Sequence, residues 1–376
     1  MGALKLLFWT SLGGLAWTHA GYPTAVALAA RLRPRRVRKA PEEPSASVIV
    51  AAHNEEEVIE RRLENLLELD YPPERLEIVV ASDASTDRTD ELVEAVSRRQ
   101  PRVRLLRCPR AGKVASQHRA VRETDGEILA FSDANSRWQP EALRRLVANF
   151  ADPEVGYVCG QLRLEETAGR NPEGAYWRYE MWLRRQESAL GSITGGNGAI
   201  YAVRRSDYVE DDPRFGHDLG LPYLMVQRGR RAVYEPEAIA WERAAAGPEE
   251  EYGRKLRMHA QSWSHILSGR MLRRTRPVYL VELLSHRILR YGSGPLHIML
   301  LGASLGLARE GPVYGAALAA QLGVLALAAA AKLRLPVPGA NLALYYLLVT
   351  WATLAGLVRY LRSGVPVVWE KAEGTR

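Results

Sequence analysis

The sequence is poor in cysteine, with only Cys108 and Cys159 among its 376 residues. Two cysteines are too few for a disulfide framework or a four-ligand zinc site, so both are expected to be buried free thiols. The 31 glycines and 21 prolines are close to average usage, which excludes collagen-like and low-complexity architectures. No Gly-x-Gly-x-x-Gly follows the first expected strand and no Gly-Lys-Ser/Thr loop is present. The sequence therefore lacks the main motif of a dinucleotide oxidoreductase and that of a P-loop ATPase.

Apolar and basic residues are abundant but unevenly distributed. Hydrophobic residues make up 47% and charged residues 25% of the chain, which excludes a disordered tail protein and leaves room for two or three cores. The formal net charge of +8 predicts an anionic surface or substrate. The mean hydropathy of −0.21 is too low for a chain that lies entirely in a membrane.

Residues 6–30 contain no Asp, Glu, Lys or Arg, and as a helix they are long enough to cross a hydrocarbon core of about 30 Å. A cleaved signal peptide is the alternative, but its apolar region is shorter and follows its basic residues. Here the basic residues come afterwards, at Arg31, Arg33, Arg35, Arg36, Arg38 and Lys39. The length of the apolar stretch therefore predicts a transmembrane anchor over residues 1–31. The positive-inside rule predicts that the domain after it is cytoplasmic.

Three further apolar stretches, 291–308, 311–331 and 335–358, predict C-terminal transmembrane segments over residues 291–361, followed by a tail over 362–376. Three full crossings would place the basic residues after the last stretch outside the cell, against the charge rule. The topology is therefore left open. The stretch 291–308 is the candidate for a re-entrant or surface-lying segment.

Residues 261–290 interleave basic and apolar side chains and predict a basic amphipathic helix on an anionic bilayer surface. A solvated basic linker is the alternative. The arginines concerned are Arg270, Arg273, Arg274, Arg276, Arg287 and Arg290. Nucleic-acid binding is not expected, because these clusters flank apolar segments and no nucleic-acid-reading motif accompanies them.

Residues 45–260 alternate short β-branched runs with helical periods, which predicts an α/β domain with a mostly parallel sheet. We expect Asn54 to cap the first helix, with Glu57 completing a capping box. The expected strands are 47–52, 76–81, 103–107 and 127–131, and the later helices are 89–98 and 113–123.

Polar residues follow the first, second and fourth expected strands, where ligands bind in open α/β sheets. After the fourth strand, Asp133 and Asn135 are separated by one residue in an expected extended segment, so their side chains project to the same side. Their oxygens suit a hard cation, Mg²⁺ or Mn²⁺, whose coordination is completed by phosphate. An ordinary Asp/Asn turn at a strand end is the alternative.

With these motifs in order, the chain resembles a family 2 glycosyltransferase of the GT-A fold, flanked by transmembrane helices and similar to polysaccharide synthase-like members. The resemblance covers residues 45–260. Six matches in the family's order are more specific than any one of them. They are 48–55, 81–89, 112–113, 131–135, 195–198 and 217–222.

The resemblance implies a catalytic base at Asp218 and a cation held by Asp133 and Asn135. Asn135 stands where the family's motif has a second Asp, so the site has one negative charge fewer. His217, which precedes the base, is expected to be its hydrogen-bonded neighbour, with a direct catalytic role as the alternative. Substrate-binding roles are implied for His53, Glu55, Asp83, Lys113, Asp133, Gly196, Asn197, Arg254 and Arg257.

Within that set, the resemblance puts Asp83 on the nucleotide base, Lys113 near the phosphates, and Gly196 and Asn197 on the donor-sugar and acceptor side. Arg257 is the expected clamp on the leaving diphosphate. Met258 replaces a Trp found in processive relatives, so processivity is left open.

The resemblance predicts a multi-pass cell-membrane enzyme with its catalytic domain in the cytoplasm. It would be an inverting glycosyltransferase that moves a sugar from a nucleoside-diphosphate donor, with a UDP-sugar expected, to a lipid-linked or polysaccharide acceptor in cell-envelope glycan synthesis. The alternative is a non-catalytic membrane transport or scaffold protein that senses nucleotide sugars, for which Asn135 and Met258 are the best support.

Overall fold

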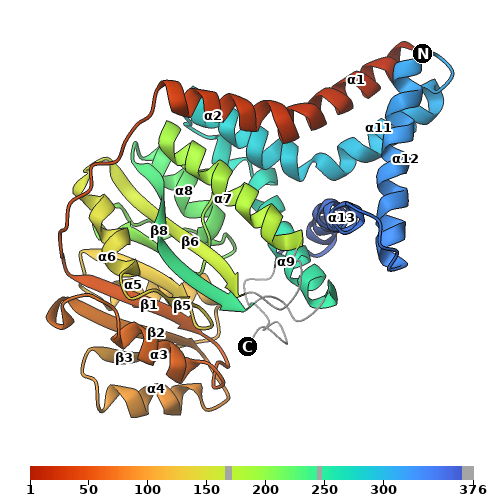
Figure 1. Ribbon diagram of the computed structural model, residues 1–376. Helices are drawn as coiled ribbons and strands as arrows, with labels where there is room; N and C mark the ends of the chain where they lie inside the picture. The colour runs from red at the N-terminus through yellow and green to blue at the C-terminus, as the bar shows by residue number, and fades with distance from the viewer. Residues whose placement is uncertain (166–171, 244–247, 366–376) are drawn as a thin grey trace.

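The computed structural model describes residues 1–165, 172–243 and 248–365. An α/β domain occupies one side of the molecule, and long helices from both ends of the chain extend from it (Figure 1). The described residues contain an eight-stranded sheet in the order β3-β2-β1-β4-β7-β6-β8-β5.

The first half of the sheet is parallel, as the sequence predicts. Its central strands are buried and consist of Val, Ile and Ala runs, which is typical of a sheet covered by helices on both faces. The strands are β1 (Ala46–Ala52), β2 (Leu76–Asp83), β3 (Val103–Cys108) and β4 (Ile128–Asp133). The helices between them are α3 (Ile59–Leu67), α4 (Thr89–Ser97) and α5 (Lys113–Arg122).

The second half of the sheet is mixed, so the prediction of a mostly parallel sheet is wrong there. β7 (Tyr201–Arg204) runs antiparallel to β4 and to β6 (Val155–Glu165). It enters the sheet directly after the loop 195–198, which already lies at the carboxyl end of β4, so the chain must run back in the opposite direction. The remaining elements are β5 (Arg137–Trp138), α6 (Ala142–Val147), α7 (Pro172–Leu190), α8 (His217–Gln227), β8 (Arg231–Arg243) and α9 (Pro248–Leu267).

The predicted capping box after β1 is also wrong. Asn54 has a φ of 56°, and its side-chain oxygen accepts a hydrogen bond of 2.8 Å from the backbone N–H of Thr86. Helix α3 begins only at Ile59, with Val58 at its N-cap and no side-chain cap. The side chain of Asn54 therefore joins the loops that follow β1 and β2, as an Asn in left-handed backbone can.

The N-terminal segment is a helical rod made of α1 (Gly2–Ala16), a π-helical turn (Trp17–Gly21) and α2 (Tyr22–Leu32) (Figure 1). The rod's apolar side chains pack against α11 (Ser293–Leu307), with Phe8 and Leu300 both buried at the contact. Neither α1 nor α2 alone has the length of a membrane span. The anchor over residues 1–31 therefore stays a prediction.

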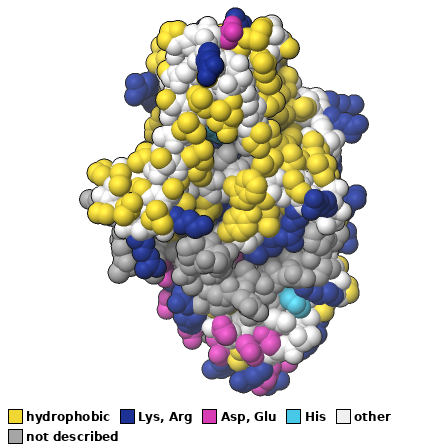
Figure 2. Space-filling view, turned by 90° about the vertical axis from the view of Figure 1, so that its right-hand side faces the viewer, with side chains coloured by type: hydrophobic (Ala, Val, Ile, Leu, Met, Phe, Trp, Pro, Cys, Tyr) yellow, Lys and Arg dark blue, Asp and Glu magenta, His cyan; other side chains and the backbone are white. Residues whose placement is uncertain are grey.

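Two of the described helices, α12 (Pro312–Lys332) and α13 (Ala340–Ser363), are long and apolar enough to cross a bilayer. Helix α11 has 15 residues, or roughly 22 Å at the usual rise, which is shorter than a hydrocarbon core. This length agrees with the expectation that 291–308 does not cross. Figure 2 shows hydrophobic side chains gathered over the helical part of the molecule, with Lys and Arg bordering them.

The predicted amphipathic helix over 261–290 is instead a series of short segments. They are the end of α9, a 3₁₀ turn (Arg270–Leu272), α10 (Pro277–Glu282) and the π-helical segment η6 (Leu283–Leu289). Arg273, Arg274 and Arg276 are exposed beside exposed Val278 and Val281. This face keeps the predicted mixture of basic and apolar groups, and its contact with lipid stays a prediction. The predicted tail lies largely outside the described residues.

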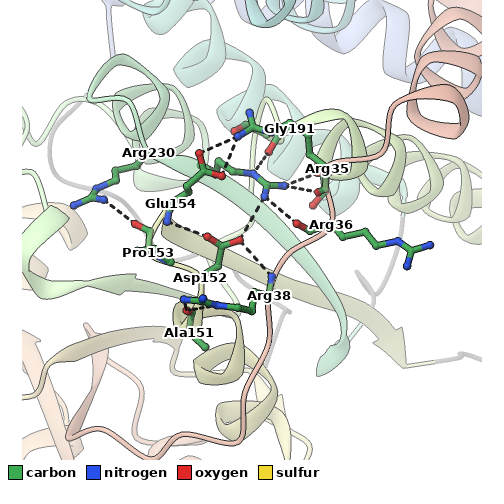
Figure 3. Close-up of polar contacts among 12 residues, drawn as sticks. Arg35, Arg36, Arg38, Ala151, Asp152, Pro153, Glu154, Gly191 and Arg230 are labelled. Carbon is green, nitrogen blue, oxygen red and sulfur yellow. Dashed lines mark hydrogen bonds and ion pairs between the residues drawn. The ribbon is translucent and has the colours of Figure 1, made fainter.

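The basic run after α2 forms a strap across the α/β domain (Figure 3). The Arg35 guanidinium donates to both carboxylate oxygens of Glu154 at 3.1 and 3.0 Å. Arg231 of β8 is 3% exposed and donates to the backbone oxygens of Arg35 at 2.8 Å and Gly191 at 3.0 Å. Its guanidinium also lies 3.7 Å from Asp152. Part of the run that the sequence assigns to the membrane surface therefore fixes the rod to the domain.

Replacing Arg231 by Gln should lower the free energy of unfolding by about 1–3 kcal/mol, because buried carbonyls and Asp152 lose their partner. Thermal unfolding of the purified full chain in detergent measures the effect. Arg228→Gln removes an exposed arginine that lies just before β8 and should leave the melting temperature unchanged. Equal melting temperatures for the two variants would contradict a stabilising strap.

Candidate active site

A cavity of about 810 Å³ lies at the carboxyl ends of β1 and β4 and reaches one side of α13. Its size is that of a small-molecule site. Most of the residues that the sequence nominates line it, although they come from distant parts of the chain. They are Glu55, Lys113, Asp133, Asn135, Gly196, Asn197, Asp218, Arg254 and Arg257.

Three charged groups surround one point at the edge of this cavity. Lys113, the first residue of α5, forms an ion pair with Asp133 at the end of β4. A Cβ atom at Gly198 would lie 2.9 Å from Lys113 Nζ, 3.1 Å from Asp133 Oδ2 and 3.3 Å from Asp218 Oδ1. Glycine leaves this point open, whereas any side chain here would have to push the three charged groups apart.

Asp218 lies in the first turn of α8, and its backbone oxygen accepts a 2.6 Å hydrogen bond from Gly196 N–H. Burial raises the pKa of its carboxyl, and the charge of Asp133 acts in the same direction, while Lys113 opposes both. For Lys113, burial lowers the pKa of the amine, but the charges of Asp133 and Asp218 raise it. The net result is a raised pKa. A carboxyl that lines a cavity, with a raised pKa and a charged amine beside it, is suited to accepting a proton during a reaction.

Asn135 lies in the turn after β4 and not in an extended segment, so the predicted reason for its shared side with Asp133 is wrong. Both residues nevertheless line the cavity. Glu242 of β8 joins them and accepts a 2.6 Å hydrogen bond from the Ser136 hydroxyl. Burial raises the pKa of Glu242 to about 7, and the charge of Asp133 adds to this effect. The sequence analysis missed Glu242, because no motif marks it and strand pairing alone brings β8 beside this turn.

The donor set of Asp133, Asn135 and Glu242 fits a hard divalent cation, because it offers oxygen atoms and an excess of negative charge. Across the described ranges, no three His, Cys, Asp or Glu side chains are arranged as a metal site made by protein alone. The fit is therefore to an ion that takes few protein oxygens and completes its coordination with phosphate.

Asp83 and His53 lie beside the cavity and are not part of its lining in the described structure. The Asp83 carboxylate is 1% exposed and accepts hydrogen bonds from the backbone N–H groups of Ala111 at 2.7 Å and Gly112 at 3.1 Å. His53 Nδ1 lies 2.8 Å from the Asp83 backbone oxygen. These residues shape the loop that leads into Lys113. A contact of Asp83 with a nucleotide base stays a prediction.

Residues 47–212, which begin in strand β1 and continue past strand β7 of the sheet, match the family described as "Glycosyl transferase family 2". These residues form a family 2 glycosyltransferase domain. Outside that range, α8 and α9 supply Asp218 and Arg257 to the same cavity.

Curated relatives of the glycosyltransferase domain align with a little over half of the chain. The probable glycosyltransferase YdaM of Bacillus subtilis is 29% identical over 223 residues, which are 53% of this chain and 50% of that protein. The beta-monoglucosyldiacylglycerol synthase of Nostoc sp. is 30% identical over 213 residues, 54% of this chain and 45% of the synthase. The poly-beta-1,6-N-acetyl-D-glucosamine synthase of Staphylococcus aureus is 25% identical over 201 residues, which are 51% of this chain and 48% of that synthase. The chain thus spans about half the length of the curated relatives it matches.

Among solved structures, the mannosyltransferase PcManGT of Pyrobaculum calidifontis, determined in complex with GDP-Man and Mn²⁺, superposes with a TM-score of 0.73. The likeness covers 94% of this chain and 99% of that one at 24% sequence identity. At this identity the likeness establishes the fold. The GT-A fold expected from the sequence is therefore confirmed, with a mixed sheet.

Two predicted residues of the glycosyltransferase domain act through the fold around the cavity. The Asn197 amide donates to Gly160 O at 2.9 Å and accepts from Ile200 N–H at 3.0 Å, so its side chain holds the loop 195–198 in place. His217 Nδ1 lies 2.7 Å from the Tyr201 hydroxyl, and burial lowers the pKa of the imidazole well below its usual value. A neutral, tyrosine-bonded His217 agrees with the interpretation of this residue as a neighbour of the base.

Gly198→Ala should weaken the binding of a nucleoside diphosphate with Mn²⁺ by roughly tenfold or more, because the added methyl group fills the point shared by three charges. Gly191→Ala is the matched control, since its Cβ would meet only Arg35 Nη1 at 4.0 Å. Calorimetric titration of both variants makes the comparison. Unchanged affinity in Gly198→Ala would place the ligand elsewhere.

Proposed function

We propose that the protein is a membrane-bound inverting glycosyltransferase that transfers a sugar from a nucleoside-diphosphate sugar to a lipid-linked or polysaccharide acceptor. One observation carries this proposal: the Asp218 carboxyl, whose pKa is raised, shares a cavity with the Lys113–Asp133 pair, and a matched family 2 segment supplies that pair. A protein that only senses nucleotide sugars has no need of such a base, so the arrangement favours chemistry.

The reaction that fits these groups is a single in-line displacement. The acceptor hydroxyl oxygen attacks the anomeric carbon while Asp218 takes its proton, and the bond from that carbon to the diphosphate oxygen breaks. Attack from the face opposite the leaving group inverts the anomeric configuration. The raised pKa of Asp218 strengthens it as a base, because a carboxylate that holds its proton more tightly accepts one more readily.

The leaving nucleoside diphosphate gains negative charge, and basic side chains on its side of the cavity stabilise it. Lys113 at the start of α5 and Arg254 and Arg257 on α9 line the cavity with the charge required. Asp133, Asn135 and Glu242 would hold Mg²⁺ or Mn²⁺, which when bound supplies positive charge to the phosphate oxygens. The structure of PcManGT with GDP-Man and Mn²⁺ supports both the donor class and the cation.

Names of relatives and the membrane helices support the acceptor class. Relatives include a glucosyldiacylglycerol synthase and a poly-N-acetylglucosamine synthase, whose names describe a lipid product and a polysaccharide product. The two long apolar helices α12 and α13 suit a membrane location. The exposed Arg31 in the last turn of α2, and the exposed Arg33 and Arg36 that follow the helix, support a cytoplasmic catalytic domain by the positive-inside rule. We place the reaction in cell-envelope glycan synthesis.

Asp218→Asn should lower transfer by about a hundredfold to ten-thousandfold, because the amide cannot accept the proton, while nucleotide binding is retained. Asp125→Asn, at an exposed position, should leave both unchanged. Radiolabelled donor turnover on membranes and calorimetric nucleotide binding separate the two effects. Full turnover by the Asp218→Asn variant would reject the assignment of the base.

A panel of donors tests the substrate class and the cation together. We expect turnover of a UDP-sugar in the presence of Mg²⁺ or Mn²⁺ and its loss on addition of EDTA, because the diphosphate charge is then no longer balanced. GDP-mannose, the ligand in the PcManGT structure, is the comparison donor. Product NMR reports the anomeric configuration. Retention of configuration, or activity unaffected by EDTA, would contradict this mechanism.

A further inference from the structure

Two arginines flank the first glycines of the loop 195–198. Arg184 of α7 donates to the backbone oxygen of Gly196 at 3.0 Å. On the other side, Arg287 of η6 lies so close to Gly195 that a Cβ there would collide with its guanidinium. Both arginines line the cavity of the active site. The sequence analysis placed Arg287 on a lipid-facing surface, but the fold turns it towards the cavity.

Neither guanidinium has a carboxylate partner within ion-pair distance among the described residues. Arg184 is only 7% exposed; its guanidinium also contacts the sulfur atoms of Cys159 and Met181 and lies over the Tyr234 ring, 5.8 Å from the ring centre. Arg287 donates through Nε to the Thr194 hydroxyl at 3.0 Å. A buried guanidinium without a carboxylate is costly, as at Arg184, and the half-buried Arg287 adds a second positive charge across the same glycines, so the pair indicates an anionic ligand.

The acidic residues near the two arginines are bound to other groups. Glu180 forms an ion pair with Arg290. Glu187 accepts a 2.6 Å hydrogen bond from the Tyr22 hydroxyl and lies 2.6 Å from His286 Nδ1. Both glutamates therefore act on Arg287 only through space. An incoming oxyanion would not have to displace either of them.

The position of the pair relates an anion to the catalytic base. The loop runs from Arg287 at its first glycine to Asp218 at its last, Gly198. Three residues of chain reach at most about 10 Å. An anion on the arginines and the proton acceptor would therefore lie at opposite ends of the same short loop. Lys113, Arg254 and Arg257, assigned above to the donor diphosphate, are a separate set of charges.

One face of α13 forms another wall of the same cavity. Its lining residues recur at helical spacing, with the apolar Leu342 and Val349 and two tyrosine rings towards the start of the helix and threonines further along. They are Leu342, Tyr345, Tyr346, Val349, Thr350 and Thr353. Helix α13 is also one of the two helices with the length and composition of a membrane span.

We propose that Arg184 and Arg287 bind the phosphate of a membrane-lipid acceptor whose headgroup carries the hydroxyl that is glycosylated. The phosphate lies on the two guanidinium groups, the hydroxyl reaches Asp218, and the apolar chains follow α13. Arginine suits this role because its planar fork matches two phosphate oxygens. This inference rests on the proposed function and narrows its acceptor to a phosphate-bearing lipid.

The test measures binding without donor or turnover. The full chain in detergent is titrated by calorimetry with dihexanoyl phosphatidylglycerol, with dihexanoylglycerol and with inorganic phosphate. Wild-type protein should bind the phosphate-bearing lipid at least about thirtyfold more tightly than either of the others, since only that ligand engages both the arginines and α13. Equal binding of the neutral lipid, or of inorganic phosphate alone, would overturn the proposal.

Variants then locate the site. Arg287→Gln and Arg184→Gln should each remove this preference, while Arg185→Gln, an exposed neighbour on α7, should keep it. Arg287 is only half-buried, so its variant remains informative if Arg184→Gln does not fold. Unchanged lipid affinity in Arg287→Gln would refute the site. Asp218→Asn should retain lipid binding while losing transfer, which separates failure of this inference from failure of the proposed reaction.

Discussion

The site depends on the close approach of opposite charges around a single glycine. Lys113 and Asp133 are brought together because α5 begins where β4 ends, and Asp218 approaches the same point from α8. In a poorly hydrated cavity these charges control one another's protonation, which raises the pKa of both Lys113 and Asp218. The loop 195–198 keeps this point open at Gly198, and the other residues of the loop line the rest of the cavity.

Sequence reasoning located the residues that follow strands well, because one rule covers them. Strands β1, β2 and β4 are buried runs and polar residues follow each of them, so Glu55 and Asp133 could be nominated from order alone, whereas Lys113 was nominated from the family resemblance. Asp218 and Arg257 carry no such local signal. They were nominated from the family resemblance, and the structure brings both to the same cavity.

Other features required three-dimensional information. Glu242 reaches the site through the pairing of β8 with β5 and β6, and strand pairing between distant segments leaves no periodic mark in a sequence. Asn54 looked like a helix cap, but a left-handed backbone and the neighbouring loop use its side chain differently. Arg287 belongs to a run whose composition suggests a lipid surface, and only the fold shows which members of such a run face inwards.

The strap and the buried glutamate of α7 bear on the independence of the catalytic domain. Although burial opposes its ionisation, His286 and the surrounding hydrogen bonds hold the pKa of Glu187 at about 2, and Tyr22 supplies one of those bonds. Arg231 likewise depends on a backbone oxygen at Arg35. Excising residues 45–260 as a soluble enzyme would cut all of these bonds and remove a wall of the cavity. Segments outside residues 45–260 are therefore structural parts of the unit that holds the cavity.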